Sequence, residues 1–492
     1  MSATKASTDA ERERLLAADT AQAGWRRWGP YVAERAWGSV REDYSADGDA
    51  WANFPFDHAR SRTYRWNEDG LAGFCDSGQN WCLALALWNG NDPIVKERLF
   101  GLTNSQGNHG EDVKEHYWFV DGLPSHAWMT WRYHYPQQAF PYADLIAENA
   151  RRGRHEPEYE LDDTGVFSQD RYFDVTVDYA KAAADDLCVR IRVRNAGPDS
   201  ATIEVLPTLW FRNTWAWGLP NAVPEPTITC NGPQLIGVHQ TSGTLTLTGL
   251  ATDFVESVAC DNETNAELLY GTPGRSAYPK DGIGDHVVHG AATISPTGVG
   301  TKAALRYRVT LAPGETRELR LRLQGGASVG PADLDGGFGT VMAARSAEAD
   351  AFFASVVPAD ASVAEARIVR QAIAGLLWSK QFYHYDVQKW LDGDPTSPPP
   401  PAGRGDIRNG GWLHLNNHDV LLMPDSWEYP WYASWDLAFH CVVLAHVDPE
   451  FAKKQLLLLL REWFMHPNGQ LPAYEWNFGD VNPPVHAWAV LR

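Results

Sequence analysis

Acidic and aromatic side chains gather in residues 424–436, which hold three carboxylates and five aromatic rings. An indole can stack on the apolar face of a sugar ring while a neighbouring carboxylate accepts hydrogen bonds from the sugar hydroxyls. Trp427, Glu428, Trp435 and Asp436 are therefore candidate sugar-binding residues. Asp436 has an alternative role as a helix-capping acid, because it is expected in a first helical turn, where the dipole favours a carboxylate.

A second cluster lies in residues 470–484, after a helix expected at residues 450–464 and before another expected to open at about residue 485, and it contains Glu475, Trp476 and Asn482. A plain polar connection between helices would not need the tryptophan. The helices expected at residues 435–446 and 450–464 are joined by a short connection, so they should be antiparallel neighbours, with the start of the first beside the end of the second. We therefore predict that Asp436 and Glu475 converge with their adjacent indoles on one concave face. Trp427, Glu428 and the loop around Asn482 would form the rim of this face.

Histidines and acids also gather in residues 108–119, and His414 and His418 lie four apart beside Asp419. Neither group has a spacing that fixes a set of metal ligands, so we predict no metal centre. The sequence also lacks a Walker loop, a dinucleotide-binding glycine motif after a strand, and a GxSxG nucleophile elbow. We accordingly expect no cofactor, and the role of residues 108–119 stays open.

Apolar and polar side chains alternate through much of residues 172–323. The alternation is regular at residues 187–193, 305–311 and 319–323, and Gly-Pro or Pro-Gly turns separate the runs. This pattern is typical of antiparallel strands with one solvated face, and many such strands in succession predict a β-sandwich.

A glycine-rich linker at residues 327–339 precedes a change to helical periodicity. We expect helices at residues 6–24, 343–356, 362–385, 435–446 and 450–464. In the third of these, one ridge is traced by Ile368, Ala372, Leu376 and Lys380. The change of period predicts an N-terminal β-sandwich domain with aromatic-rich loops at residues 1–340 and a helical domain at residues 341–492.

The composition is that of an ordinary globular protein, with 44% hydrophobic and 21% charged residues among 492. The formal net charge of −20 disfavours nucleic acid and anionic membranes as partners and favours a neutral or cationic ligand. No apolar run reaches the roughly 18 residues of a membrane span. The six cysteines form no CxxC pair and residues 1–25 lack the apolar core of a secretory signal, so we expect a cytoplasmic location.

Short motifs along the whole chain carry a resemblance to a known family. The N-terminal ones are Trp28-Gly29-Pro30-Tyr31, Glu34-Arg35, Trp37-Gly38, Val40-Arg41-Glu42-Asp43-Tyr44-Ser45 and Glu68-Asp69-Gly70-Leu71-Ala72-Gly73. The later ones are Trp435-Asp436 with Phe439-His440, and Asn482-Pro483-Pro484. With these motifs the chain resembles the bacterial branch of glycoside hydrolase family 63, the family of the processing α-glucosidase. The resemblance extends from about Trp28 to Arg492.

This resemblance implies a β-sandwich followed by an (α/α)6 toroid. It also implies inverting hydrolysis of an oligosaccharide or small glucoside by an acid and a base about 6.5–9.5 Å apart. Asp436 matches the family residue that holds hydroxyls of the sugar at the cleavage point. The family's acid and base are expected beyond Arg492. We therefore expect a C-terminally truncated chain with an incomplete toroid and neither catalytic carboxylate.

Two other functions remain open on the residues alone. One is a carbohydrate-binding protein that hydrolyses nothing. The other is a smaller glycosidase in which Asp436 and Glu475 are themselves the acid and the base.

Overall fold

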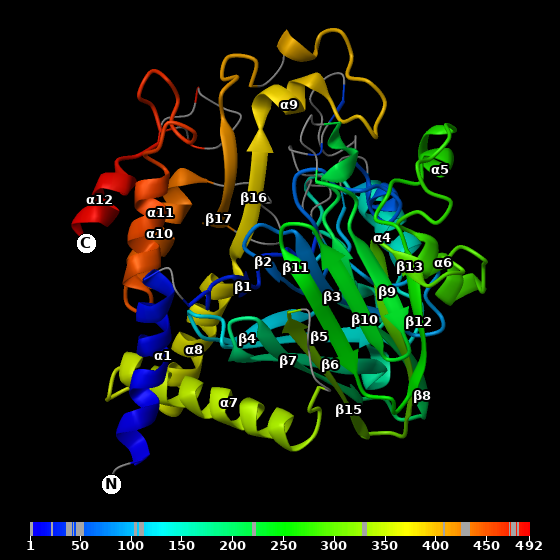
Figure 1. Cartoon of the computed structure of the whole chain (residues 1–492), viewed down its shortest axis with the longest axis horizontal. Coiled ribbons are helices and arrows are strands. Elements are labelled where there is room, and N and C mark those ends of the chain that lie inside the picture. The colour runs from blue at the N-terminus through cyan, green and yellow to red at the C-terminus, as the bar shows by residue number, and fades with distance from the viewer. Residues whose placement is uncertain are drawn as a thin grey trace.

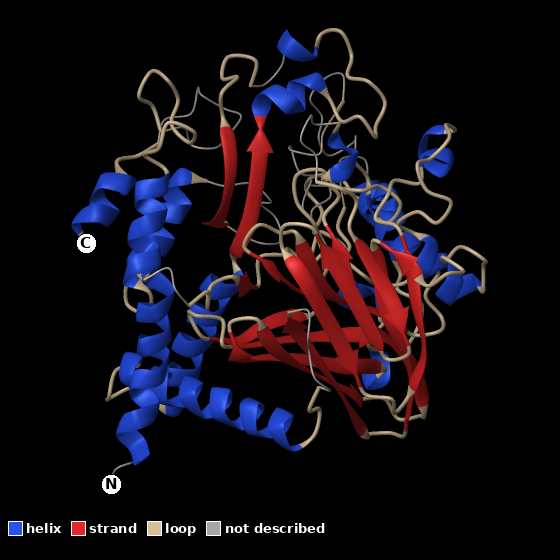
Figure 2. Cartoon of the chain, in the orientation of Figure 1, coloured by secondary structure: helices blue, strands red, loops and turns tan. Residues whose placement is uncertain are grey.

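The computed structural model describes the chain in ranges. It covers residues 3–492 apart from 21–22, 36–41, 43, 46–53, 103–105, 108–112, 219–222, 327–331, 407–408, 425–432, 472, 474–478 and 480–481. Within these ranges the chain is a multidomain mixed fold of large antiparallel β-sheets and α-helices (Figures 1 and 2).

Two antiparallel sheets pack face to face and form the body of the molecule. The six-stranded sheet has the order β1 (Trp28–Gly29), β2 (Leu71–Asp76), β3 (Trp81–Trp88), β8 (Ala201–Phe211), β14 (Lys302–Leu311), β12 (Phe254–Cys260). The nine-stranded sheet has the order β13 (Val299–Gly300), β9 (Thr227–Asn231), β10 (Gln234–His239), β11 (Gly243–Gly249), β15 (Thr316–Gly325), β7 (Asp186–Asn195), β6 (Tyr172–Ala183), β5 (Trp128–Pro136), β4 (Tyr117–Gly122).

The predicted alternation of strand residues is confirmed in β7. Its buried positions are Leu187, Val189, Ile191 and Val193, which join the core between the sheets. Across that core Phe74 of one sheet stacks on Tyr179 of the other, with ring centroids 4.5 Å apart. The sheets also take in earlier chain than predicted, since β1–β5 lie before residue 137.

One group of helices lies near the N-terminus and in the C-terminal part of the chain. They are α1 (Ala3–Asp19), α7 (Gly336–Val356), α8 (Val363–Trp378), α10 (Ser434–Leu444), α11 (Pro449–Leu458) and α12 (Val485–Leu491). The other described α-helices are α3 (Phe56–Ala59), α4 (Tyr142–Arg151), α5 (Ala266–Tyr270), α6 (Gly282–His289) and α9 (Val387–Asp392). In Figure 1, α7 packs against β5–β7 and α8 against β4, while α10–α12 stand together at the C-terminal side.

The predicted helix at residues 362–385 is wrong in its second half. Helix α8 begins with a capping box between Ser362 and Glu365 but ends at Trp378. Residues Lys380–Asp386 form β16, which pairs with β17 (Asn416–Leu422) in a two-stranded sheet. All seven residues of β16 are buried, and its run of aromatic side chains favours a strand. The region after residue 340 is therefore not purely helical.

The predicted ridge of this helix is also wrong, because Ile368 is 68% exposed. The buried side of α8 is formed by Ile373, Ala374, Leu377 and Trp378. As for membranes, none of the helices in the described ranges is long and apolar enough to span one.

A close approach between the sheets makes Gly237 of β10 a sensitive position. A Cβ atom there would lie 2.4 Å from the Trp81 ring of β3. We expect Gly237→Ala to lower the free energy of unfolding by about 1–3 kcal/mol, because a packed core resists added volume. Urea unfolding followed by circular dichroism measures this change.

Gly375 of α8 provides a matched control. Apart from its chain neighbours and the backbone of its own helix, a Cβ atom there meets no described atom within 4 Å. We expect Gly375→Ala to be neutral or to stabilise the protein by up to about 1 kcal/mol, as alanine does inside a helix. Equal losses in the two variants would contradict this account of the sheet packing.

Candidate functional site

The structure places Trp435 and Asp436 in the first turn of α10, as predicted. Asp436 is the third helical residue, and Ala433 before the helix provides no side-chain cap. The Trp435 side chain is 43% exposed, whereas Asp436 is half-buried. An exposed indole and an accessible carboxylate therefore lie next to each other at the start of this helix.

The loop after α11 adjoins the start of α10. The Ser434 amide donates a hydrogen bond to the Ala473 carbonyl at 2.9 Å. The Asn482 side chain donates from Nδ2 to the Leu471 carbonyl at 2.7 Å. The other candidates, Trp427, Glu428, Glu475 and Trp476, lie outside the described residues. Convergence of the Asp436 and Glu475 carboxylates thus stays a prediction.

Helices α10–α12 present an apolar surface beside this site. A groove of about 560 Å³ is lined by residues of all three helices. Phe439 and Trp488 meet edge to face with ring centroids 5.7 Å apart, and they are 48% and 40% exposed. Leu457 and Leu460 are 56% and 49% exposed. Contiguous apolar surface of this kind usually marks a contact with another part of a protein or with a partner.

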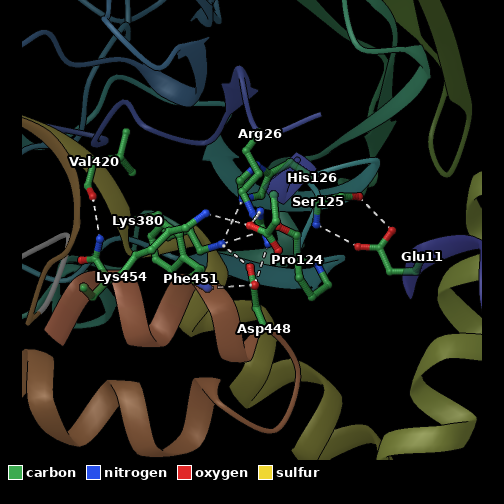
Figure 3. Close-up of polar contacts among 12 residues, drawn as sticks. Glu11, Arg26, Pro124, Ser125, His126, Lys380, Val420, Asp448, Phe451 and Lys454 are labelled. Atoms are coloured by element: carbon green, nitrogen blue, oxygen red, sulfur yellow. Dashed lines mark hydrogen bonds and ion pairs between the residues drawn. The ribbon is translucent and has the colours of Figure 1, made fainter. Parts of the chain in front are cut away.

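A buried cluster of charges, the Asp448 joint, fixes these helices to the sheets (Figure 3). Asp448 caps α11, since its Oδ1 accepts from the Phe451 amide at 3.3 Å. Arg26 Nη2 donates to the same oxygen at 2.6 Å, and Lys380 Nζ lies 3.7 Å from Oδ2. Lys380 also donates to His126 Nε2 at 3.3 Å. Asp448 and Lys380 are 1% and 0% exposed in their side chains.

Burial controls the protonation of the Asp448 joint. It lowers the pKa of Lys380 to about 8, although Asp448 opposes the shift. Burial and the Lys380 charge hold the pKa of His126 well below its usual range, so this imidazole is neutral. The arrangement has the properties of a structural connection rather than a catalytic centre, because each group is already engaged inside the protein.

A further group, the hairpin cluster, was not among the predicted sites. It comprises Arg65, Trp66, Arg212, Trp217, Phe382, His384 and His418. His384 and His418 face each other across β16 and β17, with ring centroids 4.8 Å apart. His384 also packs against Trp66 and Trp217 at 5.2 and 5.4 Å. The residues of the cluster come from several separate segments, so no sequence motif predicts it. Only Arg65 and Trp66 are neighbours in the sequence.

The histidines of the hairpin cluster are neutral. Burial and the charge of Arg212 hold the pKa of His384 well below its usual range. Partial desolvation and Arg212 lower the pKa of His418 to about 4, although this residue keeps an exposed edge.

The histidine- and acid-rich segment at residues 108–119 is described only in part. Glu115 is fully buried and pairs with Lys96 at 3.0 Å. His116 stacks on Phe167 at 4.6 Å. These contacts are structural. Over the ranges that the structure describes, no group of three or more His, Cys, Asp or Glu side chains could hold a metal ion.

The chain is similar to the uncharacterized protein YMR196W of Saccharomyces cerevisiae. The two are 42% identical over 526 aligned residues, which cover 98% of this chain and 48% of the yeast protein. The chain therefore spans about half the length of this relative. No protein-family model matches the chain.

Solved structures show only distant similarity. A candidate kojibiose phosphorylase from the human microbiome has 11% identity and a TM-score of 0.23, covering 81% of this chain and 44% of that protein. A candidate aldose 1-epimerase from Escherichia coli K12 has 10% identity and a TM-score of 0.22, covering 47% and 82%. TM-scores at this level do not establish a shared fold.

The Asp448 joint can be tested by Asp448→Asn. This change leaves Arg26 and Lys380 buried with less compensating charge, so we expect unfolding free energy to fall by about 3 kcal/mol. Glu450→Gln on the same helix is the matched control. Glu450 pairs with Lys453 at the surface, where the side chains are 51% and 65% exposed. The control should change stability by less than about 1 kcal/mol in urea unfolding. Similar small losses in both variants would contradict the role of the joint.

Proposed function

We propose that the chain is part of a carbohydrate-processing enzyme and that Trp435 and Asp436 belong to its sugar-binding site. One observation carries this proposal: the exposed indole and the half-buried carboxylate adjoin in the first turn of α10. Such a pair places a stacking surface and a hydrogen-bond acceptor in one helical turn, where we propose that a bound saccharide contacts both. The substrate we propose is a neutral oligosaccharide or small glucoside, acted on in the cytoplasm.

The specific reaction we propose is inverting hydrolysis of the α-glucosidase type. Its support is the resemblance of residues 28–73 and of the Trp435-Asp436 pair to glycoside hydrolase family 63. In such a reaction one carboxyl group protonates the leaving oxygen and another activates water on the opposite face. Asp436 would do neither. It would accept hydrogen bonds from hydroxyls of the sugar at the cleavage point, while the acid and base lie beyond Arg492.

We further propose that residues 1–340 form a sandwich domain and that residues 341–492 are the first part of an (α/α)6 toroid. The exposed apolar surface of α10–α12 supports this proposal, because it could pack against further helices. A protein as long as the yeast relative has enough additional chain to cover that surface.

Sugar binding can be measured by calorimetric titration of the purified chain with maltose. We expect a saturable signal that Asp436→Asn weakens about tenfold, because one charge-assisted hydrogen bond is worth about 1.5–3 kcal/mol. Asp360→Asn, at an exposed aspartate between α7 and α8, is the control and should leave the affinity unchanged. Unchanged affinity in Asp436→Asn would return Asp436 to the role of a helix-capping acid.

A hydrolysis assay distinguishes the proposed fragment of a glycosidase from a smaller glycosidase and from a carbohydrate-binding protein. With p-nitrophenyl α-D-glucoside we expect no turnover by this chain above the background without enzyme. Turnover that Glu475→Gln abolishes would show that Asp436 and Glu475 are the acid and base of a smaller glycosidase. Sugar binding without turnover, even in a longer protein containing this chain, would identify a carbohydrate-binding protein.

The exposed surface of α10–α12 makes a separate prediction. Leu457→Gln should reduce binding of a hydrophobic dye and leave the melting temperature nearly unchanged, because Leu457 is 56% exposed. The neighbouring Leu456 is 9% exposed, so Leu456→Gln should clearly lower the melting temperature. A similar thermal loss in both variants would mean that the surface is already packed in this chain.

A further inference from the structure

Two buried cations in the hairpin cluster lack an anionic partner in the described part of the chain. Arg65 and Arg212 are each 4% exposed. Neither side chain has a carboxylate within ion-pair distance in the ranges that the structure describes. The Nε atoms of both guanidinium groups are buried and likewise have no hydrogen-bond acceptor there.

The two guanidinium groups share one aromatic wall. Their central carbons lie 5.4 Å (Arg65) and 5.3 Å (Arg212) from the centre of the Trp217 ring. Trp66 lies 5.1 Å from Arg65, and Phe382 lies 4.8 Å from Arg212. The positive charges therefore lie against the same buried aromatic rings, where water screens them little.

The polar contacts of these arginines are all with neutral groups. Arg212 donates from Nη1 to His384 Nδ1 at 3.1 Å and to the Arg65 carbonyl at 3.4 Å. Arg65 donates from Nη1 to the Gly393 carbonyl at 2.6 Å. Glu68 and Asp76 are near enough to act on Arg212 through space, but neither is within ion-pair distance of it. Glu68 accepts a hydrogen bond from the Asn262 side chain at 2.8 Å, and Asp76 accepts from the Trp81 amide and the Asn80 side chain at 2.8 and 2.9 Å.

We propose that Arg65 and Arg212 bind a small oxyanion, either phosphate or the carboxylate of an acidic sugar. An arginine does not lose its proton at physiological pH, so two buried arginines that no carboxylate of the described ranges pairs with favour a negative charge from outside. The planar guanidinium matches the oxygens of phosphate and carboxylate groups. His418 is exposed and adjoins His384, so we place the solvent side of the proposed site there.

The positive charge of this site is opposite in sign to the net charge of the chain. The net charge of −20 disfavours anionic ligands in general. Specific binding of one anion therefore requires that the charge of the two arginines acts at short range among the aromatic rings that surround them.

The test is thermal unfolding of the whole chain in chloride buffer at constant ionic strength. Sodium phosphate and sodium D-glucuronate are added separately, each at about 20 mM. We expect at least one anion to raise the melting temperature saturably by about 2 °C. A shift with phosphate alone identifies a phosphoryl group, and a shift with glucuronate alone identifies a sugar carboxylate. A shift with both identifies an oxyanion site in general, and no shift with either overturns the proposal.

Substitutions of the two arginines test whether the anion-dependent rise in melting temperature comes from this site. Arg212→Met should abolish the anion-dependent shift, and Arg65→Met should do the same, so either one suffices if the other does not fold. Arg322→Met is the matched control and should keep the shift, because Arg322 is paired with Asp186 at 2.7 Å. A shift that persists in folded Arg212→Met or Arg65→Met overturns the proposal. Asp436→Asn should also keep the shift, so that failure of the proposed sugar site and failure of the anion site are distinguishable.

Discussion

The buried carboxylate of Asp448 ties the C-terminal helices to the rest of the structure. It caps α11 and is held at the same time by Arg26, which precedes β1, and by Lys380 of β16. Charges this deeply buried are tolerated only while their geometry is kept. Helix α11, strand β16 and the segment before β1 are therefore bound to one arrangement.

A second attachment lies farther along α11. The Gln455 side chain accepts a hydrogen bond from the Leu422 amide at 3.1 Å and donates to the Val420 carbonyl at 2.9 Å. This carboxamide satisfies the edge of β17 as a neighbouring strand would. Since α10 packs against α11, the place of Asp436 follows from the same two attachments.

Much of the fold follows from patterns in the sequence. The alternation in β7 predicts which of its side chains are buried, because successive side chains of a strand point to opposite faces of the sheet. Asp448 and Pro449 mark the start of α11, where a capping acid precedes proline in the first turn. The pattern misleads at residues 379–385, where three-and-four spacing continues by chance into a buried strand. Burial among the surrounding aromatic rings outweighs local periodicity there.

The candidate sites differ in how much of their arrangement can be predicted from the sequence. Trp435 and Asp436 are neighbours in the chain, so their common position in one helical turn is predictable. The convergence with Glu475 rests on residues outside the described ranges and stays a prediction. The hairpin cluster joins segments hundreds of residues apart, such as Arg65 and His384, and only the folded arrangement brings them together.

Strand β16 runs between two buried cations that differ in their partners. From Lys380 to His384, β16 covers about 13 Å. At the Lys380 end the cation has a carboxylate partner, Asp448. At the His384 end the neighbouring cation is Arg212, whose contacts are neutral. Lys96 is another buried cation with a carboxylate partner, Glu115.

Buried lysines without a carboxylate do occur in this chain, and they show why the arginines are different. Lys181 and Lys280 donate to backbone carbonyls, and burial lowers their pKa values to about 7 and about 8. A lysine in such a place can release its proton and become neutral. An arginine cannot become neutral in this way, so Arg65 and Arg212 keep their charges in the folded protein. Because no carboxylate of the described ranges pairs with them, their charge favours the external anion proposed above.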